Sequence, residues 1–218
     1  MTDADAVEIR VLGCLIEKQR TTPDQYPLSL NALRLACNQS TNRDPIVDYD
    51  ERTIKAALER MSIRGWTRFA SGASSRALKY RQLLDEALGL SDAEISVLAV
   101  MMLRGPQTLG ELKGRSERMH QFGSLEEVDA TLGGLAGREL AARVPRRPGQ
   151  KEDRYAQLLG GGMDGVEDAP PPSAVEEHAP EVDRLAVLER RVDELERVVG
   201  EFAEQLSGEG FGRTHPNR

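Results

Sequence analysis

The sequence predicts a mainly α-helical α+β protein: two tandem winged helix-turn-helix domains with small β-hairpin wings, followed by a C-terminal coiled-coil helix. Three observations lead to this prediction. The chain repeats itself once, each repeat shows helical periodicity followed by a strand–turn–strand signal, and a heptad pattern lies near the C-terminus. The composition agrees, because only 4% of the 218 residues are aromatic, and an aromatic-poor chain rich in Leu, Ala, Arg and Glu leans helical.

The internal repeat is visible as matched segments in the same order. The segment EIRVLGCL (8–15) matches EISVLAVM (94–101), PLSLNAL (27–33) matches PQTLGEL (106–112), and KYRQLL (79–84) matches RYAQLL (154–159). A conserved order with a drifting offset indicates a duplicated unit of about 75–85 residues whose loops differ in length.

In the first copy, Ile9, Leu12 and Ile16 follow helical spacing and predict the first helix. A second helix is expected near 30–38 and a third near 51–64, with Asp50 as its N-cap. The segments 66–70 and 78–82 flank a Ser/Gly-rich turn and predict a hairpin.

The second copy has the same order of signals. Ser91 with Glu94, Thr108 with Glu111, and Ser124 with Glu127 each have the spacing of a capping box, so helices are expected to begin at these three points, the latter two near 109–119 and 125–138. The segments 141–144 and 154–157 flank a Pro/Arg/Gly turn and predict the second hairpin. Three helices followed by a hairpin is the winged-helix order; a helical bundle with irregular loops is the alternative.

These signals divide the chain into five parts. We expect winged-helix domains at 1–86 and 87–160, an acidic Pro/Gly-rich linker at 161–180, a coiled-coil helix at 181–207 and a disordered tail at 208–218. The coiled coil rests on a 3,4 spacing of apolar residues, which predicts a homodimer interface; packing of this helix against its own domains is the alternative. The candidate interface residues are Leu185, Leu188, Val192, Leu195, Val199, Phe202 and Leu206.

Charge and composition exclude several function classes. Residues 1–160 carry 23 Lys+Arg and 22 Asp+Glu, whereas residues 161–218 carry 6 and 14, so the acidic excess lies in the C-terminal part. Without a signal-peptide pattern or a long apolar run, we expect a cytoplasmic protein with no membrane partner. The two cysteines lie in apolar helical patterns and the three histidines are scattered, so neither a metal nor another cofactor is expected. No catalytic grouping of side chains is suggested, so we expect no enzyme activity.

The candidate nucleic-acid-binding residues lie mainly in the first copy. A winged helix reads DNA with its third helix and contacts the backbone with its wing, and Lys and Arg supply much of the affinity. The third helix of the first copy is basic opposite its apolar stripe, whereas that of the second copy is acidic. If the second copy contacts nucleic acid, we therefore expect it to use its wing and flank; otherwise it is a protein-binding or pairing module. The candidates are Asn42, Arg43, Arg52, Lys55, Arg60, Arg68, Arg76, Lys79, Arg146 and Arg147.

Two segments, TTPDQYPLSLNALRLACNQSTNRDP (21–45) and DERTIKAALERMSIRGW (50–66), strongly resemble the bacterial YceH-like family. The resemblance covers about residues 5–160 and implies a tandem winged-helix fold. It brings no established activity and no binding residues to transfer.

Two functions remain open on the sequence. The first is binding of double-stranded DNA, with a transcription-regulatory role exercised through domain 1. The second is protein interaction or assembly without DNA, as in the tandem winged helices of kleisin-binding subunits of chromosome-condensation complexes. Fold alone does not choose between them.

Overall fold

The computed structural model describes residues 4–70, 78–146 and 152–161, which belong to one compact unit, Met1–Ala169. A second unit, Pro170–Arg218, lies outside the described residues. The expected coiled-coil helix, the tail and all seven candidate interface residues belong to this undescribed part of the chain. Among the described residues, no helix combines the length and the apolar character needed to cross a membrane. The predicted α+β class is confirmed: the described residues form helices and two small antiparallel sheets.

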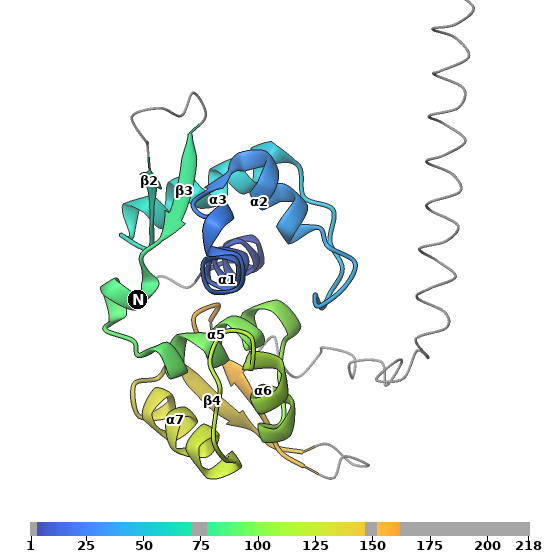
Figure 1. The fold of residues 1–218 in the computed structure, drawn as a ribbon, viewed down its shortest axis with the longest axis vertical. Helices are drawn as coiled ribbons and strands as arrows, with labels where there is room; N and C mark the ends of the chain where they lie inside the picture. The colour runs from blue at the N-terminus through green and yellow to red at the C-terminus, as the bar shows by residue number, and fades with distance from the viewer. Residues whose placement is uncertain (1–3, 71–77, 147–151, 162–218) are drawn as a thin grey trace, which may run out of the picture. The chain divides into compact units, whose positions relative to one another are not determined.

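Repeat one (residues 5–88) begins with the 16-residue helix α1 (Ala6–Thr21). Its other elements are η1 (Pro23–Gln25), β1 (Leu28–Ser29), α2 (Leu30–Cys37), α3 (Glu51–Ile63), β2 (Thr67–Ala70), β3 (Lys79–Gln82) and α4 (Leu84–Leu88). The strands form a three-stranded antiparallel sheet in the order β1-β3-β2; Figure 1 shows β2 and β3 side by side. The predicted helices and hairpin are therefore present, while β1 and the short α4 had no sequence signal that we recognised.

Repeat two (residues 91–159) follows the same plan with α5 (Asp92–Arg104), α6 (Leu109–Ser116), α7 (Leu125–Gly137), β4 (Ala141–Val144) and β5 (Arg154–Gln157). Where repeat one pairs Leu28 of β1 with Tyr80 of β3, repeat two has an isolated bridge between Gln107 and Tyr155. These four residues occupy matching positions of the aligned segments. The backbone pairing thus supports the duplication that the sequence indicates.

The helix starts agree with the predicted caps in all but one detail. Asp50 accepts a hydrogen bond from the Thr53 amide, and the capping boxes at Ser91 and Thr108 are complete. The Ser124 hydroxyl accepts a hydrogen bond from the Glu127 backbone amide. The Glu127 carboxylate, however, accepts its hydrogen bond from the backbone amide of Gly123 and not from that of Ser124. The capping box predicted there is therefore half formed. Helix α6 also ends at Ser116, three residues before its predicted end.

Helices α1 and α5 hold the two repeats together (Figure 1). Every residue from Glu8 to Ile16 and from Ile95 to Leu103 is buried. A helix that is apolar on all sides must be covered on all sides, and here each helix contacts its own repeat and the other repeat. Where the two helices meet, a Cβ placed on Gly13 would lie 3.0 Å from side-chain atoms of Leu103 and Met102. The packing therefore leaves no space for a side chain at this position.

Candidate nucleic-acid interface

Helix α3 exposes two cations in its N-terminal half, alongside the acids Glu51 and Glu59. The stripe formed by Ile54, Leu58 and Met61 is buried, which leaves Arg52 and Lys55 exposed on the other side. Residues three apart are neighbours on a helix surface, so these two cations lie together. Lys55 Nζ lies 4.0 Å from Glu59, an exposed pair of the kind that contributes little. This half of α3 therefore offers two cations to solvent.

The hairpin of repeat one has one buried face and one basic face. Thr67 pairs with Gln82 and these two side chains are buried, as is Tyr80 opposite Phe69. Because side chains alternate along a strand, Arg68 and its partner Arg81 lie on the opposite face with Lys79. Arg81 pairs with Glu86 at 2.7 Å, whereas Arg68 and Lys79 form no ion pair in the described part of the chain. Arg76 lies outside the described residues.

Arg60 is committed to a contact inside repeat one. Its guanidinium lies 2.5 Å from the Asp5 carboxylate and 3.1 Å from Glu8 Oε1, and both acids belong to the capping box of α1. Arg64 joins the same carboxylate of Glu8. The side chain of Arg60 is 46% exposed, but its charge is compensated by two acids. Arg60 thus connects the start of α1 to the end of α3.

Arg43 is not on the surface, which corrects its assignment as a DNA contact. Its side chain is fully buried, with Nη2 2.6 Å from Glu17 and Nε donating to the Ala36 carbonyl at 3.1 Å. Burial alone would raise the pKa of Glu17, but the hydrogen bonds and charge of Arg43 outweigh it, so that pKa lies below its usual value. The polar sequence around Arg43 predicted a residue of a surface loop, whereas in the fold Arg43 forms an ion pair in the interior.

Asn42 is also engaged within the fold. It adopts a positive φ of 59°, and its side-chain oxygen accepts a hydrogen bond from Arg104 of repeat two. Next to it, the Asp44 amide donates to the Leu103 carbonyl at 2.8 Å. The 38–50 loop is thus tied to α5, so Asn42 lies at the contact between the repeats.

The residues that hold the two ends of this loop together were not identified from the sequence. Asn38 exchanges two hydrogen bonds with the backbone of Tyr49, both 2.9 Å long. Arg10, on α1, is buried and donates to the carbonyls of Cys37 at 3.1 Å and Pro45 at 2.6 Å. The sequence carried only a weak signal for Arg10, a charged residue inside an otherwise apolar helical run.

The wing of repeat two offers fewer uncompensated cations. Arg143 pairs with Asp153, and Arg154 pairs with Glu111 at 2.8 Å. On α7, Glu126 and Asp129 are exposed, as the acidic pattern predicts, and Asp129 accepts a hydrogen bond from the Tyr155 hydroxyl at 2.9 Å. Arg146 is exposed, while Arg147 lies outside the described residues. Of the two candidates in this repeat, the structure therefore describes Arg146. It follows strand β4 in a wing whose Arg143 and Arg154 are already paired with acids.

No group of three or more His, Cys, Asp or Glu side chains in the described ranges is arranged to hold a metal ion. Cys14 and Cys37 are free and buried, as the apolar pattern predicts. The candidate surface of repeat one therefore reduces to Arg52 and Lys55 on α3 with Arg68 and Lys79 on the hairpin.

Comparison with known proteins places the chain among bacterial relatives. A family model described as "Protein of unknown function, DUF480" matches residues 4–150. A UPF0502 protein of Solibacter usitatus is 48% identical over 198 residues, covering 91% of this chain and 95% of the relative. A UPF0502 protein of Geobacter sulfurreducens is 47% identical over 194 residues, covering 87% and 88%, and one of Shewanella amazonensis is 43% identical over 198 residues, covering 88% and 93%.

Proposed function

The chain belongs to the DUF480 family of bacterial proteins, and from this starting point we propose that it is a non-enzymatic, cytoplasmic DNA-binding protein built from two winged-helix domains. Repeat one would contact double-stranded DNA through α3 and the β2–β3 hairpin. A dimeric transcriptional regulator is the role that this arrangement fits.

The order of elements supports the winged-helix assignment. Each repeat has three helices followed by an antiparallel hairpin, and a short extended segment before the second helix pairs with the hairpin. In such a domain the third helix enters the major groove. Helix α3 begins at a capped N-terminus with Arg52 in its first turn, where the helix dipole favours phosphate.

The division of the cations in repeat one carries the proposal. Arg10, Arg43, Arg60 and Arg81 are engaged by backbone carbonyls or carboxylates inside the fold. Arg52, Arg68 and Lys79 have no such partner in the described part of the chain, and Lys55 has only a distant exposed one. Cations without internal partners are available to neutralise phosphates, and each phosphate contact releases condensed counterions.

Salt-dependent binding to a short mixed-sequence duplex, measured by fluorescence anisotropy, tests this proposal. The double variant R52A/R68A is expected to weaken binding and to reduce the slope of log K against log salt by about 2, since each lost phosphate contact removes about 0.9 from the slope. The matched control R138A/R143A removes the same net charge from repeat two, where both arginines already pair with acids. An equal loss in the control would mean that net charge alone acts, and no binding at low salt would reject the proposal.

A protein-interaction module is the second candidate, and exposed apolar side chains favour it. Ile63, Phe69 and Leu78 are 88%, 49% and 60% exposed, and Leu35 and Ile46 are 56% and 66% exposed. All five belong to repeat one. Apolar surface of this kind fits a protein partner better than a phosphate backbone. If DNA binding fails, retention of a partner by the full chain and its loss in I63D would support this second function.

A further inference from the structure

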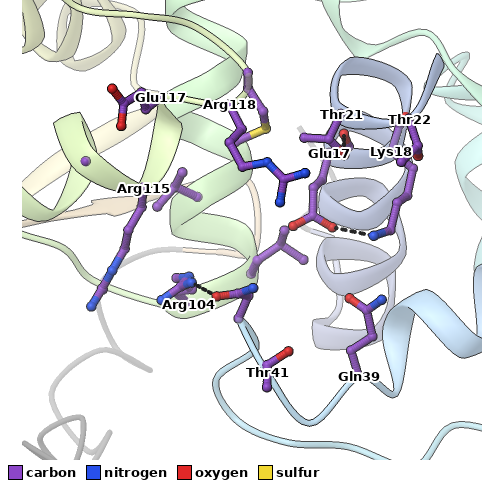
Figure 2. Close-up of a pocket in the computed structure, with 15 residues that line it drawn as sticks. Glu17, Lys18, Thr21, Thr22, Gln39, Thr41, Arg104, Arg115, Glu117 and Arg118 are labelled. Carbon is purple, nitrogen blue, oxygen red and sulfur yellow. Dashed lines mark hydrogen bonds and ion pairs between the residues drawn. The ribbon is translucent and has the colours of Figure 1, made fainter. Parts of the chain in front are cut away.

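An open cavity of about 520 Å³ lies where the two repeats meet. Figure 2 shows its two walls: α1 and the 38–50 loop contribute Lys18, Gln39 and Thr41, and the opposite side contributes Arg104, Arg115 and Arg118. The volume lies within the range of small-molecule sites, which often form at the boundary between domains. The walls are rich in charged and hydroxyl groups, so a polar ligand is indicated.

The charge of the lining is positive. Four cations (Lys18, Arg104, Arg115 and Arg118) line the cavity, together with two acids, Glu17 and Glu117. Glu17 is already neutralised by Arg43 at 2.6 Å and lies 3.5 Å from Lys18, while Glu117 points away from the cavity in Figure 2. Lys18 and Arg115 also have acidic partners, so Arg104 and Arg118 are the lining cations without an acidic partner in the described part of the chain.

Two of the arginines are held in place. Arg104 donates to Asn42 across the contact between the repeats, and Arg115 is held by Gln107 and Glu111. Burial lowers the pKa of Arg104, and the neighbouring charges of Arg115 and Arg43 lower it further. An anion placed beside Arg104 would offset this repulsion.

Arg118 differs from the other arginines of the cavity. Its guanidinium projects into the cavity towards α1 (Figure 2), and within the described residues it has no hydrogen bond or ion pair. A planar guanidinium presents paired N–H donors that match the oxygens of a phosphate group. Arg118 is thus available to a ligand that Arg104 and Arg115 would also attract.

We propose that this cavity binds a small diffusible molecule carrying a phosphate group, with Arg104 and Arg118 as its main donors. Cations from both walls, Lys18, Arg104 and Arg118, match an anion of charge two or more better than a monocarboxylate. The polar groups of Gln39 and Thr41 would contact the rest of the molecule. Because such a ligand touches both repeats, its binding would stabilise their contact through α1 and α5.

Calorimetric titration of the full chain with inorganic pyrophosphate tests the proposal. Wild-type protein is expected to bind one pyrophosphate per chain and to unfold at a higher temperature in its presence. R118Q and R104Q are each expected to weaken binding at least about tenfold, the loss expected from one charge-assisted hydrogen bond to a phosphate. R143Q is the matched control, because it removes the same charge from repeat two outside the cavity lining, and its affinity should equal that of wild type.

Loss of fold is controlled in the same samples, since R118Q removes no internal partner and should unfold at the wild-type temperature without ligand. No heat of binding in wild type, or equal weakening by R143Q, would overturn the proposal. Citrate binding as tightly as pyrophosphate would assign the cavity to carboxylates and overturn the phosphate assignment.

A competition experiment distinguishes a free phosphate compound from the phosphates of DNA as the ligand of the cavity. Duplex DNA should not displace pyrophosphate, and R118Q should bind duplex as wild type does, because the proposed DNA surface uses Arg52 and Arg68. Displacement by duplex, together with weaker duplex binding by R118Q, would assign the arginines to the DNA backbone and overturn the small-molecule proposal. The R52A/R68A variant should keep its pyrophosphate affinity, so the two proposals can fail independently.

Discussion

At the scale of single residues, the buried arginines determine how the 38–50 loop folds. Removing a guanidinium from water is costly unless its donors find acceptors. Arg43 satisfies this condition with Glu17 and two backbone carbonyls, and Arg10 does so with the carbonyls of Cys37 and Pro45. The loop is therefore fixed by side chains of α1 and by its own arginine, without regular secondary structure.

The Glu17–Arg43 pair predicts a specific dependence of stability on pH. The folded-state pKa of Glu17 lies below the value of 4.5 that holds in the unfolded chain. The pair therefore stabilises the fold above about pH 4.5, and this contribution disappears as the pH falls through the lower folded-state pKa. E17Q is expected to cost about 3 kcal/mol at neutral pH, the low end for breaking a buried pair, because Glu17 is partly exposed.

Urea unfolding of wild type and E17Q across this pH range checks the prediction. The gap in unfolding free energy between them should narrow as the pH drops below about 4.5. E152Q is the control: it replaces an exposed loop acid outside the helices and should track wild type at every pH. A gap that stays constant down to acidic pH would show that the charge of Glu17 contributes nothing to stability.

The two buried cysteines predict slow thiol chemistry. Cys14 and Cys37 have no exposed surface, and the hydrogen bond with Cys14 and burial both raise the pKa of Cys37. A disulfide reagent must reach the sulfur, so it should label neither buried cysteine in the native protein and both in urea. Time courses of thiol release would show this, and rapid native labelling of either cysteine would contradict the packing described for α1 and α2.

At the scale of elements, the close approach of α1 and α5 predicts an effect of bulk at Gly13. Even a Cβ there would lie 3.0 Å from Leu103 and Met102, so G13L must push α5 away. Overpacking of this kind costs about 1–3 kcal/mol or more. The control is G133L on α7, where nothing lies within 4 Å of an added Cβ and the helix gains about 1 kcal/mol in propensity. Thermal unfolding should therefore move in opposite directions for the two variants, and a stable G13L would contradict the close packing.

Elements whose signals are local were predictable, and elements defined by distant partners were not. Apolar spacing and cap residues placed both ends of α3 and α7 to within one residue, and they placed the start of α5. The pairing of β1 with β3 and the tie between Asn42 and Arg104 join positions about 50–60 residues apart, and no local pattern encodes them. For the same reason Arg43 and Arg60 were expected on the DNA surface, because their charge was visible and their acidic partners on α1 were not.

At the scale of the whole molecule, the charge is distributed unevenly along the chain. Residues 1–160 are nearly neutral, whereas residues 161–218 carry 14 acids and 6 bases. Internal ion pairs then leave a few cations of repeat one, and Arg104 and Arg118 of repeat two, without acidic partners in the described part of the chain, so the low overall isoelectric point does not argue against an anionic ligand. Both proposals depend on this local selection of cations, and neither depends on net charge.

The last prediction concerns self-association through the heptad residues, which lie outside the described part of the chain. With apolar residues at positions a and d over about three heptads, the 24.0 kDa chain is expected to dimerise, with about twice that mass by light scattering after gel filtration. L188D/L195D places charge at two d positions and should give the monomer mass. A186D/V187D adds the same charge off the a and d positions and should remain dimeric.

If the proposed DNA binding holds, the monomeric variant should also bind a duplex with two sites more weakly, because the second contact is no longer intramolecular. A monomeric wild type would remove this avidity and leave repeat one to bind alone.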